Sequence, residues 1–202
     1  NGEADILIGT QMIVKGHDFP NVTLVAALAA DMSLYAGDYR SSERTFELLM
    51  QASGRAGRAE KAGEVVIQTY NPEEYSIQAV AGQDAEYFYE NELAFRRLMK
   101  YPPYSQMAAI LILSEEENEA KTLSEKLAEN IHSVCGDAVT LIGPSKAGLS
   151  RAKDRYRYVL YVKSMDEEAM ACVREIAEEA NRRVVNQKTC SVQYDRDPVN
   201  GY

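Results

Sequence analysis

The order of apolar patterns in the second half of the chain constrains its fold most strongly. Apolar runs predict strands, and apolar residues at helical spacing predict helices. In chain order these are strand 107–113, helix 117–134, strand 139–143, strand 156–163, helix 167–183 and strand 190–195. A Ser-x-x-Glu capping box precedes each helix, beginning at Ser114 and at Ser164. This βαββαβ order predicts a ferredoxin-like domain.

The first half of the chain has the pattern of an open α/β sheet. Strands are expected at 5–8, 22–30 and 64–70, a helix is expected from Ser42 as its N-cap, and further helices are expected over 72–100. The run at 22–30 has no polar break, which is typical of a parallel strand buried on both faces. Tyr101-Pro102-Pro103-Tyr104 ends the last helix. We therefore expect two domains, 1–104 and 105–202.

Charge and cysteine content exclude several classes of site. The chain has 22 Lys and Arg against 31 Asp and Glu, a net charge of -9, so any nucleic-acid site must be a local basic patch. Cys135, Cys172 and Cys190 are too far apart to supply paired zinc ligands, and we expect no metal site among them. No run approaches the roughly 18 apolar residues of a membrane span, and the acidic start is unlike a signal peptide. We expect a cytoplasmic protein, and a fragment, because the chain opens directly on a strand.

The string QASGRAGR, from Gln51 to Arg58, is the strongest indication of chemistry. It follows the helix expected from Ser42 and has the form QxxGRxGR. Arg55 and Arg58 would share a helical face, and two planar guanidiniums suit a polyphosphate. Arginines at a helix end can also merely complement the helix dipole. The complete string favours a nucleotide site.

A second string, GTQMIVKGHDFP, runs from Gly9 to Pro20 after the first expected strand. At the carboxyl end of such a strand, hydroxyl and backbone N–H groups can meet a phosphate, and Asp18 could accept from a ribose hydroxyl or orient a water. The alternative is an ordinary connecting loop, in which His17 is a turn residue. The chain has no GxxxxGKS/T phosphate loop, so half of an ATPase site is missing.

Cations gather in the middle of the second domain, with Asp154 as the one acid among them. They are Lys146, Arg151, Lys153, Arg155, Arg157 and Lys163, and Tyr156, Tyr158 and Tyr161 are interleaved. We predict that 145–154 is a mobile loop that grips phosphates or an acidic peptide tail. Alternatively, on a strand the tyrosines would be core residues and the arginines would be solvated.

The two strings resemble motifs V and VI of superfamily 2 helicases, and their surroundings resemble the PriA family of bacterial replication-restart helicases. The segments that carry the resemblance are ILIGTQMIVKGHDFPNVTLV, DYRSSERTFELLMQASGRAGRAEKAGEVVIQTYNPEEY and RRLMKYPPYSQMA. The resemblance covers almost the whole chain. The family usually has QVAGRAGR where Ala52-Ser53 stand, and Pro-Asp where Gly37-Asp38 stand; neither change alters a charged contact.

The resemblance implies that residues 1–104 are the end of the second RecA-like lobe and that 105–202 are the C-terminal domain. The parent would be an ATP-dependent DNA helicase that unwinds 3′ to 5′ and reloads the replication machinery at stalled forks. Gln51, Arg55 and Arg58 would lie at the nucleotide, with Arg58 as the arginine finger, and Gly16 and Asp18 would lie near it. Thr10, Gln11 and Lys15 would lie near the DNA strand or coupling elements. Together with the cations already described, our candidate DNA-binding residues are Thr10, Gln11, Lys15, Lys146, Arg151, Lys153, Arg155 and Arg157.

The resemblance also implies cofactors and partners. ATP and Mg²⁺ would bind in a site completed by the missing lobe, and zinc would bind clustered cysteines upstream of this fragment. The partners would be branched or single-stranded DNA, the tail of the single-stranded DNA-binding protein and other primosome proteins, with no membrane. Two alternatives stay open: another superfamily 2 helicase, which would carry the same QxxGRxGR string, or a non-enzymatic adaptor that binds nucleic acid or protein.

Overall fold

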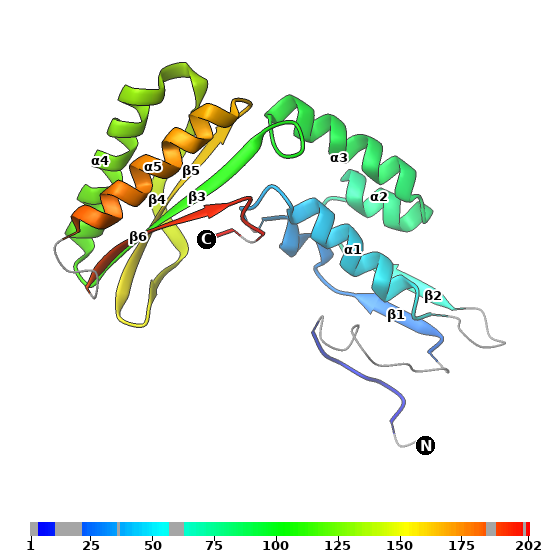
Figure 1. Cartoon of the computed structure of the whole chain (residues 1–202). Coiled ribbons are helices and arrows are strands. Elements are labelled where there is room, and N and C mark those ends of the chain that lie inside the picture. The colour runs from blue at the N-terminus through cyan, green and yellow to red at the C-terminus, as the bar shows by residue number, and fades with distance from the viewer. Residues whose placement is uncertain (1–3, 11–21, 36, 57–62, 185–188, 200) are drawn as a thin grey trace. The chain divides into compact units, whose positions relative to one another are not determined.

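The structure is a computed structural model that describes residues 4–10, 22–35, 37–56, 63–184, 189–199 and 201–202. The chain divides into two compact units, Asn1–Ala94 and Phe95–Tyr202. The division falls inside helix α3 (Ala85–Met99), earlier in the chain than the double proline at which the sequence placed it (Figure 1). Each unit has its own hydrophobic core, so each is described by itself.

The first unit contains a parallel pair of strands, as the α/β expectation requires. Strand β1 (Leu24–Ala27) pairs with β2 (Glu64–Ile67), and Leu24 lies opposite Glu64. The helices of this unit are the 3-10 helix η2 (Ala30–Tyr35), α1 (Ser41–Ser53), α2 (Tyr75–Gly82) and most of α3. Phe46 of α1 stacks on Phe88 of α3 with ring centroids 4.1 Å apart, which places the core between the helices.

Two strand predictions in this unit are wrong. Residues 5–8 form no strand, and Ile8 is 90% exposed, because no described segment pairs with them to satisfy their backbone groups. Strand β1 is shorter than 22–30 and alternates exposed with half-buried residues. A strand is buried on both faces only where elements cover both. Helix α1 begins at Ser41, and its N-cap is Arg40 rather than Ser42.

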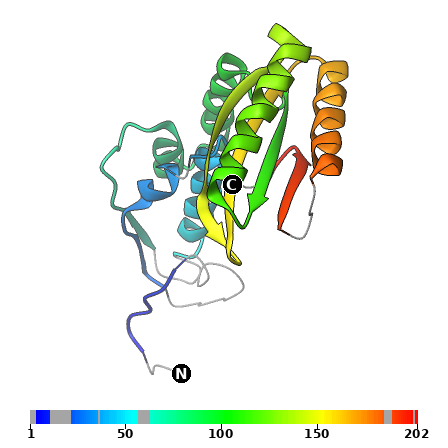
Figure 2. The ribbon, with the colours of Figure 1, turned by 90° about the vertical axis from the view of Figure 1, so that its left-hand side faces the viewer.

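The second unit is a four-stranded antiparallel sheet with two helices on one face. Its strands are β3 (Gln106–Ser114), β4 (Thr140–Ala152), β5 (Arg155–Ser164) and β6 (Cys190–Arg196), in the order β4-β5-β3-β6. The helices are α4 (Glu117–Cys135) and α5 (Glu167–Arg183), with the short 3-10 helix η3 (Gly136–Ala138) after α4. This arrangement confirms the predicted ferredoxin-like βαββαβ fold (Figures 1 and 2).

Alternation along the strands sorts residues between the two faces of this sheet. Ile110 of β3 and Leu160 of β5 are fully buried beneath Leu127 of α4 and Val173 of α5. On the opposite face, a smaller cluster is built from the intervening positions. Its buried members are Ala109, Leu111, Ala147 and Val159. The sheet therefore has an apolar core on both sides, and only one of them lies under the helices.

Both predicted capping boxes are wrong. Helix α5 is capped by Asp166, whose carboxylate accepts hydrogen bonds from the backbone N–H groups of Glu168 and Ala169. Ser164 instead donates to the carbonyl of Ala138 at 2.6 Å. Helix α4 begins after Glu116, which makes no side-chain cap, and Ser114 hydrogen bonds with Glu119. Each serine lies at the end of a strand, and its hydroxyl has another partner: a carbonyl far away in the chain for Ser164 and a side chain of the following helix for Ser114.

The segment 145–154, predicted as a loop, is mostly strand. Strand β4 continues to Ala152, and a two-residue turn, Lys153-Asp154, joins it to β5 with positive φ at both residues (51° and 59°). The pairing with β5 shifts at Gly143, where φ is 98° and an added Cβ would lie 3.0 Å from the carbonyl oxygen of Val159. We call residues 145–157 the basic hairpin. No helix within the described ranges is long and apolar enough to cross a membrane.

Candidate functional sites

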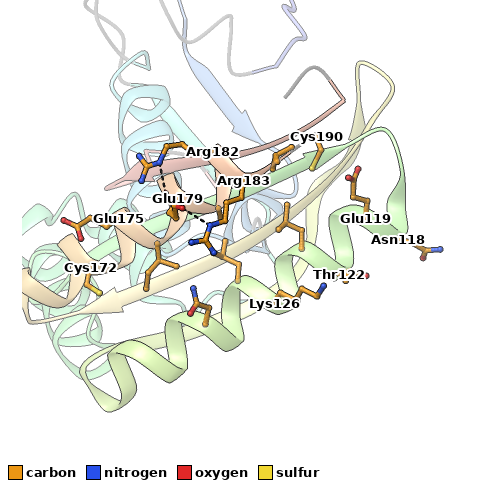
Figure 3. Close-up of a pocket in the computed structure, with 16 residues that line it drawn as sticks. Asn118, Glu119, Thr122, Lys126, Cys172, Glu175, Glu179, Arg182, Arg183 and Cys190 are labelled. Atoms are coloured by element: carbon orange, nitrogen blue, oxygen red, sulfur yellow. Dashed lines mark hydrogen bonds and ion pairs between the residues drawn. The ribbon is translucent and has the colours of Figure 1, made fainter. Parts of the chain in front are cut away.

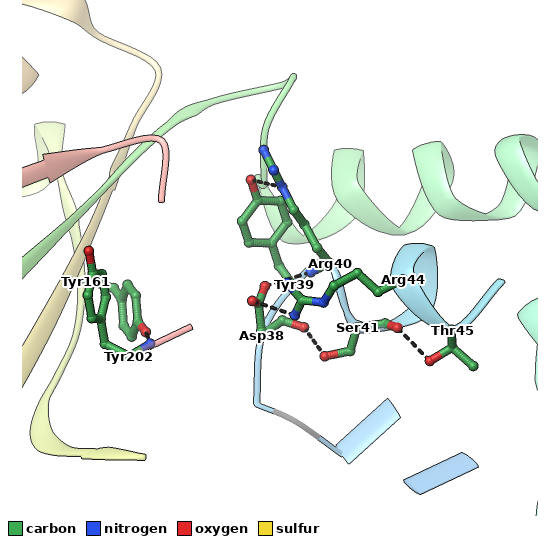
Figure 4. A network of polar contacts seen from close by, with 8 residues as sticks. All are labelled: Asp38, Tyr39, Arg40, Ser41, Arg44, Thr45, Tyr161 and Tyr202. Atoms are coloured by element: carbon green, nitrogen blue, oxygen red, sulfur yellow. Dashed lines mark hydrogen bonds and ion pairs between the residues drawn. The ribbon is translucent and has the colours of Figure 1, made fainter. Parts of the chain in front are cut away.

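A polar network holds the start of α1, the helix that leads into the QxxGRxGR string. The Asp38 side chain is almost completely buried, forms a 2.6 Å ion pair with Arg44 Nη2 and accepts a hydrogen bond from the Arg40 backbone N–H at 2.9 Å (Figure 4). Ser41 Oγ donates to the Asp38 carbonyl at 2.6 Å. Only the polar character of 38–42 indicated this network in the sequence. It fixes the position from which α1 begins.

The far end of α1 places part of the predicted nucleotide site. Gln51 lies on the last turns of α1 and is exposed, while Ala52 beside it is buried. The helix ends at Ser53, and Arg55 lies in the turn that follows, with its backbone N–H donating to the Ala52 carbonyl at 3.0 Å. The prediction that Arg55 lies on the helix is therefore wrong, because α1 ends at Ser53. The face that it was predicted to share with Arg58 stays a prediction. Arg58 lies outside the described residues.

The string between the first two expected strands is only partly described. Thr10 is exposed and belongs to no helix or strand. Gln11, Lys15, Gly16 and Asp18 all lie outside the described residues, so their predicted contacts with DNA or nucleotide stay predictions.

Hydrogen bonds connect the segment that follows β1 with the segment that follows β2, just beyond the carboxyl ends of both strands. Ala30 N–H donates to the Gln68 carbonyl at 2.9 Å, and Tyr70 N–H donates to Asp31 Oδ2 at 3.0 Å. Asp31 is 2% exposed, and its second oxygen accepts no hydrogen bond among the described residues. Open α/β sheets bind ligands at this edge. The sequence marked Asp31 only as the end of a strand.

The described residues fit a nucleotide in part. The Gln51 amide and the half-buried Arg55 guanidinium are donors suited to phosphate or ribose oxygens. Within the described ranges, no group of three His, Cys, Asp or Glu side chains is placed to hold a metal ion. Among the described residues, Gln51 and Arg55 are therefore the donors that we consider for a nucleotide.

The basic hairpin is formed by β4, β5 and the turn between them (Figure 2). It carries the cations Lys146, Arg151, Lys153, Arg155 and Arg157. Lys153 is exposed at the turn. Arg151 lies over the Tyr156 ring, 5.2 Å from its centroid, and forms a 3.6 Å ion pair with Asp154. Arg157 donates to the Leu149 carbonyl at 3.2 Å, and Arg155 is half-buried. The cations are thus carried by paired backbone rather than by a loop.

Lys146 forms a close ion pair with an acid of α4. Its Nζ lies 2.5 Å from Glu117 Oε1 at the start of α4. The hydrogen bond from Lys146 lowers the pKa of Glu117, and the same bond raises the pKa of Lys146. Both groups are solvent-exposed, where such pairs contribute little to stability. Lys146 would have to exchange this carboxylate for a DNA phosphate.

The tyrosines of this segment and Lys163 are not at the hairpin surface. Tyr158 is buried in the core beneath the helices and Tyr156 packs against it, so these two rings are core residues. Lys163 was predicted to belong to the cationic cluster, and this is wrong. Its Nζ donates to the Met99 carbonyl at 2.8 Å and lies 4.0 Å from the Tyr101 ring centroid, because β5 carries it under the end of α3.

A groove of about 1120 Å³ separates α4 from α5 (Figure 3). Its charged lining is mixed: Glu119, Lys126, Glu175, Glu179, Arg182 and Arg183. Glu179 accepts from both Arg182 and Arg183 at 2.8 Å, so the two arginines are held by an acid of the same helix. The acidic and basic residues of this lining balance, so the groove has no excess positive charge that would favour DNA or an acidic peptide.

Two family models match the chain. The model described as the primosomal protein N C-terminal domain matches residues 97–199, and the model described as the helicase conserved C-terminal domain matches residues 1–60. The first covers the whole ferredoxin-like sheet, and the second includes β1 and α1.

Curated relatives match the chain at high identity. The replication restart protein PriA of Bacillus subtilis is 46% identical over 197 residues, which are 98% of this chain and 24% of the relative. The protein of the same name from Synechocystis is 43% identical over 80% of this chain and 20% of the relative, and that from Chlamydia trachomatis is 34% identical over 98% and 26%. The chain thus spans about a quarter of the length of these relatives.

Proposed function

Because the chain belongs to the PriA family of replication restart proteins, we propose that it forms part of an ATP-dependent DNA helicase. In this proposal the full-length protein that carries the chain, called the parent protein below, unwinds DNA in the 3′-to-5′ direction. It recognises stalled or branched forks in the cytoplasm of a bacterium and starts primosome assembly there. Family membership supports the role in replication restart.

One observation carries this proposal: a single chain joins a parallel α/β unit, with α1 leading into GRxGR, to a ferredoxin-like unit with a cationic hairpin. The first unit supplies donors to a nucleotide, and the second supplies donors to DNA. ATP, when bound, supplies a phosphoryl group whose transfer releases energy. Gln51 and Arg55 would hold its phosphate or ribose oxygens, and Arg58 would meet the charge that develops on the phosphoryl group.

We assign DNA binding to two places. Thr10, Gln11 and Lys15 would contact the strand that the helicase moves along, with Gly16 and Asp18 nearer the nucleotide. Arg151 and Lys153 of the basic hairpin would contact phosphates of the fork, assisted by Lys146, Arg155 and Arg157. The hairpin could equally hold an acidic protein tail, such as that of the single-stranded DNA-binding protein. We favour DNA because Arg151 and Lys153 are both exposed, and guanidinium and ammonium groups suit phosphate oxygens.

Steady-state ATP hydrolysis separates an enzyme from an adaptor. The parent protein and the 202-residue chain are each assayed with and without a synthetic replication fork. We expect fork-stimulated hydrolysis by the parent and only background hydrolysis by the chain, since a phosphate loop is absent from it. A parent protein without ATP turnover at any fork concentration would favour the adaptor.

A further inference from the structure

The segment that follows β6 returns across the sheet to the basic hairpin. Tyr202 packs against the apolar cluster on the face opposite α4 and α5, beside Tyr161 (Figure 4). Three hydrogen bonds hold it there. Tyr202 N–H donates to Tyr161 Oη at 2.8 Å, Tyr202 Oη donates to Asp195 Oδ2 at 2.5 Å, and Gly148 N–H donates to the Tyr202 carbonyl at 2.9 Å. One residue therefore joins β4, β5 and β6.

The bond from Gly148 matters because β4 is irregular at this point. Lys146 pairs with Tyr158 and Arg151 pairs with Tyr156, so residues 147–150 stand opposite a single residue of β5, Arg157. A bulge of this size removes ladder hydrogen bonds from the longer strand. Two contacts compensate: Arg157 donates to the Leu149 carbonyl at 3.2 Å, and Gly148 donates to Tyr202.

We propose that Tyr202 is a positioning residue, which holds the bulged part of β4 on the sheet and thereby orients the hairpin cations for phosphate contact. The proposal rests on the proposed DNA-binding role of the hairpin. Arg151 and Lys153 follow the bulge directly. Contacts that hold the bulged backbone in one conformation therefore also restrict the backbone of these two residues. A hairpin ordered before binding loses less conformational entropy when it binds, and its affinity is higher for that reason.

The surroundings of the Tyr202 hydroxyl keep it protonated at neutral pH. Burial, and then the hydrogen bond to Asp195, raise its pKa to about 12, while Arg157 acts in the opposite direction and Tyr161 adds to the rise. Because the folded-state pKa lies above the ordinary value of 10.0, this contribution to stability is complete below pH 10 and is lost as pH rises toward 12. The Tyr202 hydroxyl therefore keeps its proton, and its hydrogen bond to Asp195, under the conditions in which DNA binding is measured.

The test compares three variants of the parent protein. Tyr202→Ala removes the ring and the bond to Asp195, Tyr202→Phe removes only that bond, and Val199→Ala is the control, because Val199 is an exposed residue of the same segment. Hydrogen exchange at the Gly148 amide and trypsin cleavage after Arg151 and Lys153 report the order of the hairpin. Binding of a synthetic fork, measured over a range of salt concentrations, reports phosphate contact.

We expect Tyr202→Ala to speed exchange at Gly148 and cleavage of the hairpin, and to weaken fork binding by about 3- to 10-fold, the cost of ordering one or two side chains. Tyr202→Phe should have a smaller effect, and Val199→Ala should have none. In a background of Arg151→Gln and Lys153→Gln, Tyr202→Ala should still speed exchange but should weaken binding no further. That coupling is the signature of positioning, since general destabilisation would add to the loss.

The outcomes separate the two proposals. If Tyr202→Ala speeds exchange at Gly148 but leaves fork binding unchanged, while Arg151→Gln with Lys153→Gln weakens it, the positioning role is wrong and the DNA-binding role stands. If the arginine and lysine changes leave binding unchanged, the hairpin does not bind the fork, and both proposals fail. Unaltered exchange at Gly148 in Tyr202→Ala would show that the Tyr202 side chain does not hold the bulged part of β4, and the positioning role would be wrong.

Discussion

Lys163 shows how a single cation can be removed from the surface by its place in the fold. Its ammonium group lies beneath the end of α3, bonded to the Met99 carbonyl and facing the Tyr101 ring. Burial, and then the nearby charge of Lys100, lower its pKa below 10.5. Nothing in the sequence around Lys163 distinguishes it from the hairpin cations, because its partners lie far away in the chain.

This pKa shift predicts a pH dependence of stability. Between the lowered folded-state pKa and 10.5, the unfolded chain binds more protons at Lys163 than the folded chain does. The free energy of unfolding should therefore rise with pH relative to that of Lys163→Met, which cannot titrate there. Denaturant unfolding of both proteins at several alkaline pH values measures the difference. A difference that stays flat or falls as pH rises would contradict the burial of this charge.

The two arginines of the GRxGR string differ in their expected roles. An arginine finger acts on charge that develops as the phosphoryl group leaves, whereas a supporting arginine also binds the nucleotide before reaction. In the parent protein, Arg58→Ala should lower fork-stimulated ATP hydrolysis by about 10³-fold or more and leave nucleotide binding largely intact. Arg58→Lys should also be badly impaired, since one ammonium cannot reproduce a planar fork.

Arg55→Ala should weaken nucleotide binding as well as turnover. Titration with a non-hydrolysable nucleotide, beside steady-state turnover, distinguishes the two residues. Near-normal hydrolysis by Arg58→Ala would refute its assignment as the finger. The reverse pattern in the two variants would transfer that role to Arg55.

Among the elements of the second unit, most were predicted from the sequence, but the β4 half of the basic hairpin was not. The core strands β3 and β5 and both helices of the second unit were predicted to within a residue or two, because their apolar residues repeat at strand or helix spacing. The extension of β4 was missed, since Ser145–Ala152 is polar, glycine-bearing and bulged. The turn Lys153-Asp154 also lacks the glycine or asparagine that usually marks a two-residue hairpin.

The candidate sites were predicted less completely, and for a physical reason. Short strings such as QxxGRxGR reveal residues that act together because they are near in sequence. The contacts of Lys163 and Tyr202 are tertiary, and no local spacing encodes them. The strand expected at 5–8 was predicted from an apolar pattern that is present, yet it does not form. A strand also needs a neighbouring strand to pair with.

Charge reversal tests the hairpin as an element. Arg151→Glu with Lys153→Glu should weaken fork binding by the parent protein, more strongly at low salt than at high salt. If both side chains contact phosphates, the slope of log affinity against log salt should fall in magnitude by about 2. Lys121→Glu with Arg174→Glu is the matched control, because these exposed residues of α4 and α5 give the same change in charge. Equal binding by the hairpin variant and the unmodified protein at low salt would support solvated cations without a DNA role.

At the scale of the whole molecule, two units with separate cores are joined through α3 in one chain. The first unit contains the QxxGRxGR string, and the second carries the basic hairpin. A net charge of -9 confines nucleic-acid binding to such local patches. We propose that ATP turnover at one unit drives movement along DNA that the other unit helps to recognise.

Strand displacement by the parent protein tests this claim most directly. Two synthetic partial duplexes, one with a 3′ single-stranded tail and one with a 5′ tail, are incubated with the protein and ATP, and a non-hydrolysable analogue serves as the control. We expect release of the labelled strand from the 3′-tailed duplex, only with ATP. Release from the 5′-tailed duplex alone, or equal release with the analogue, would contradict it.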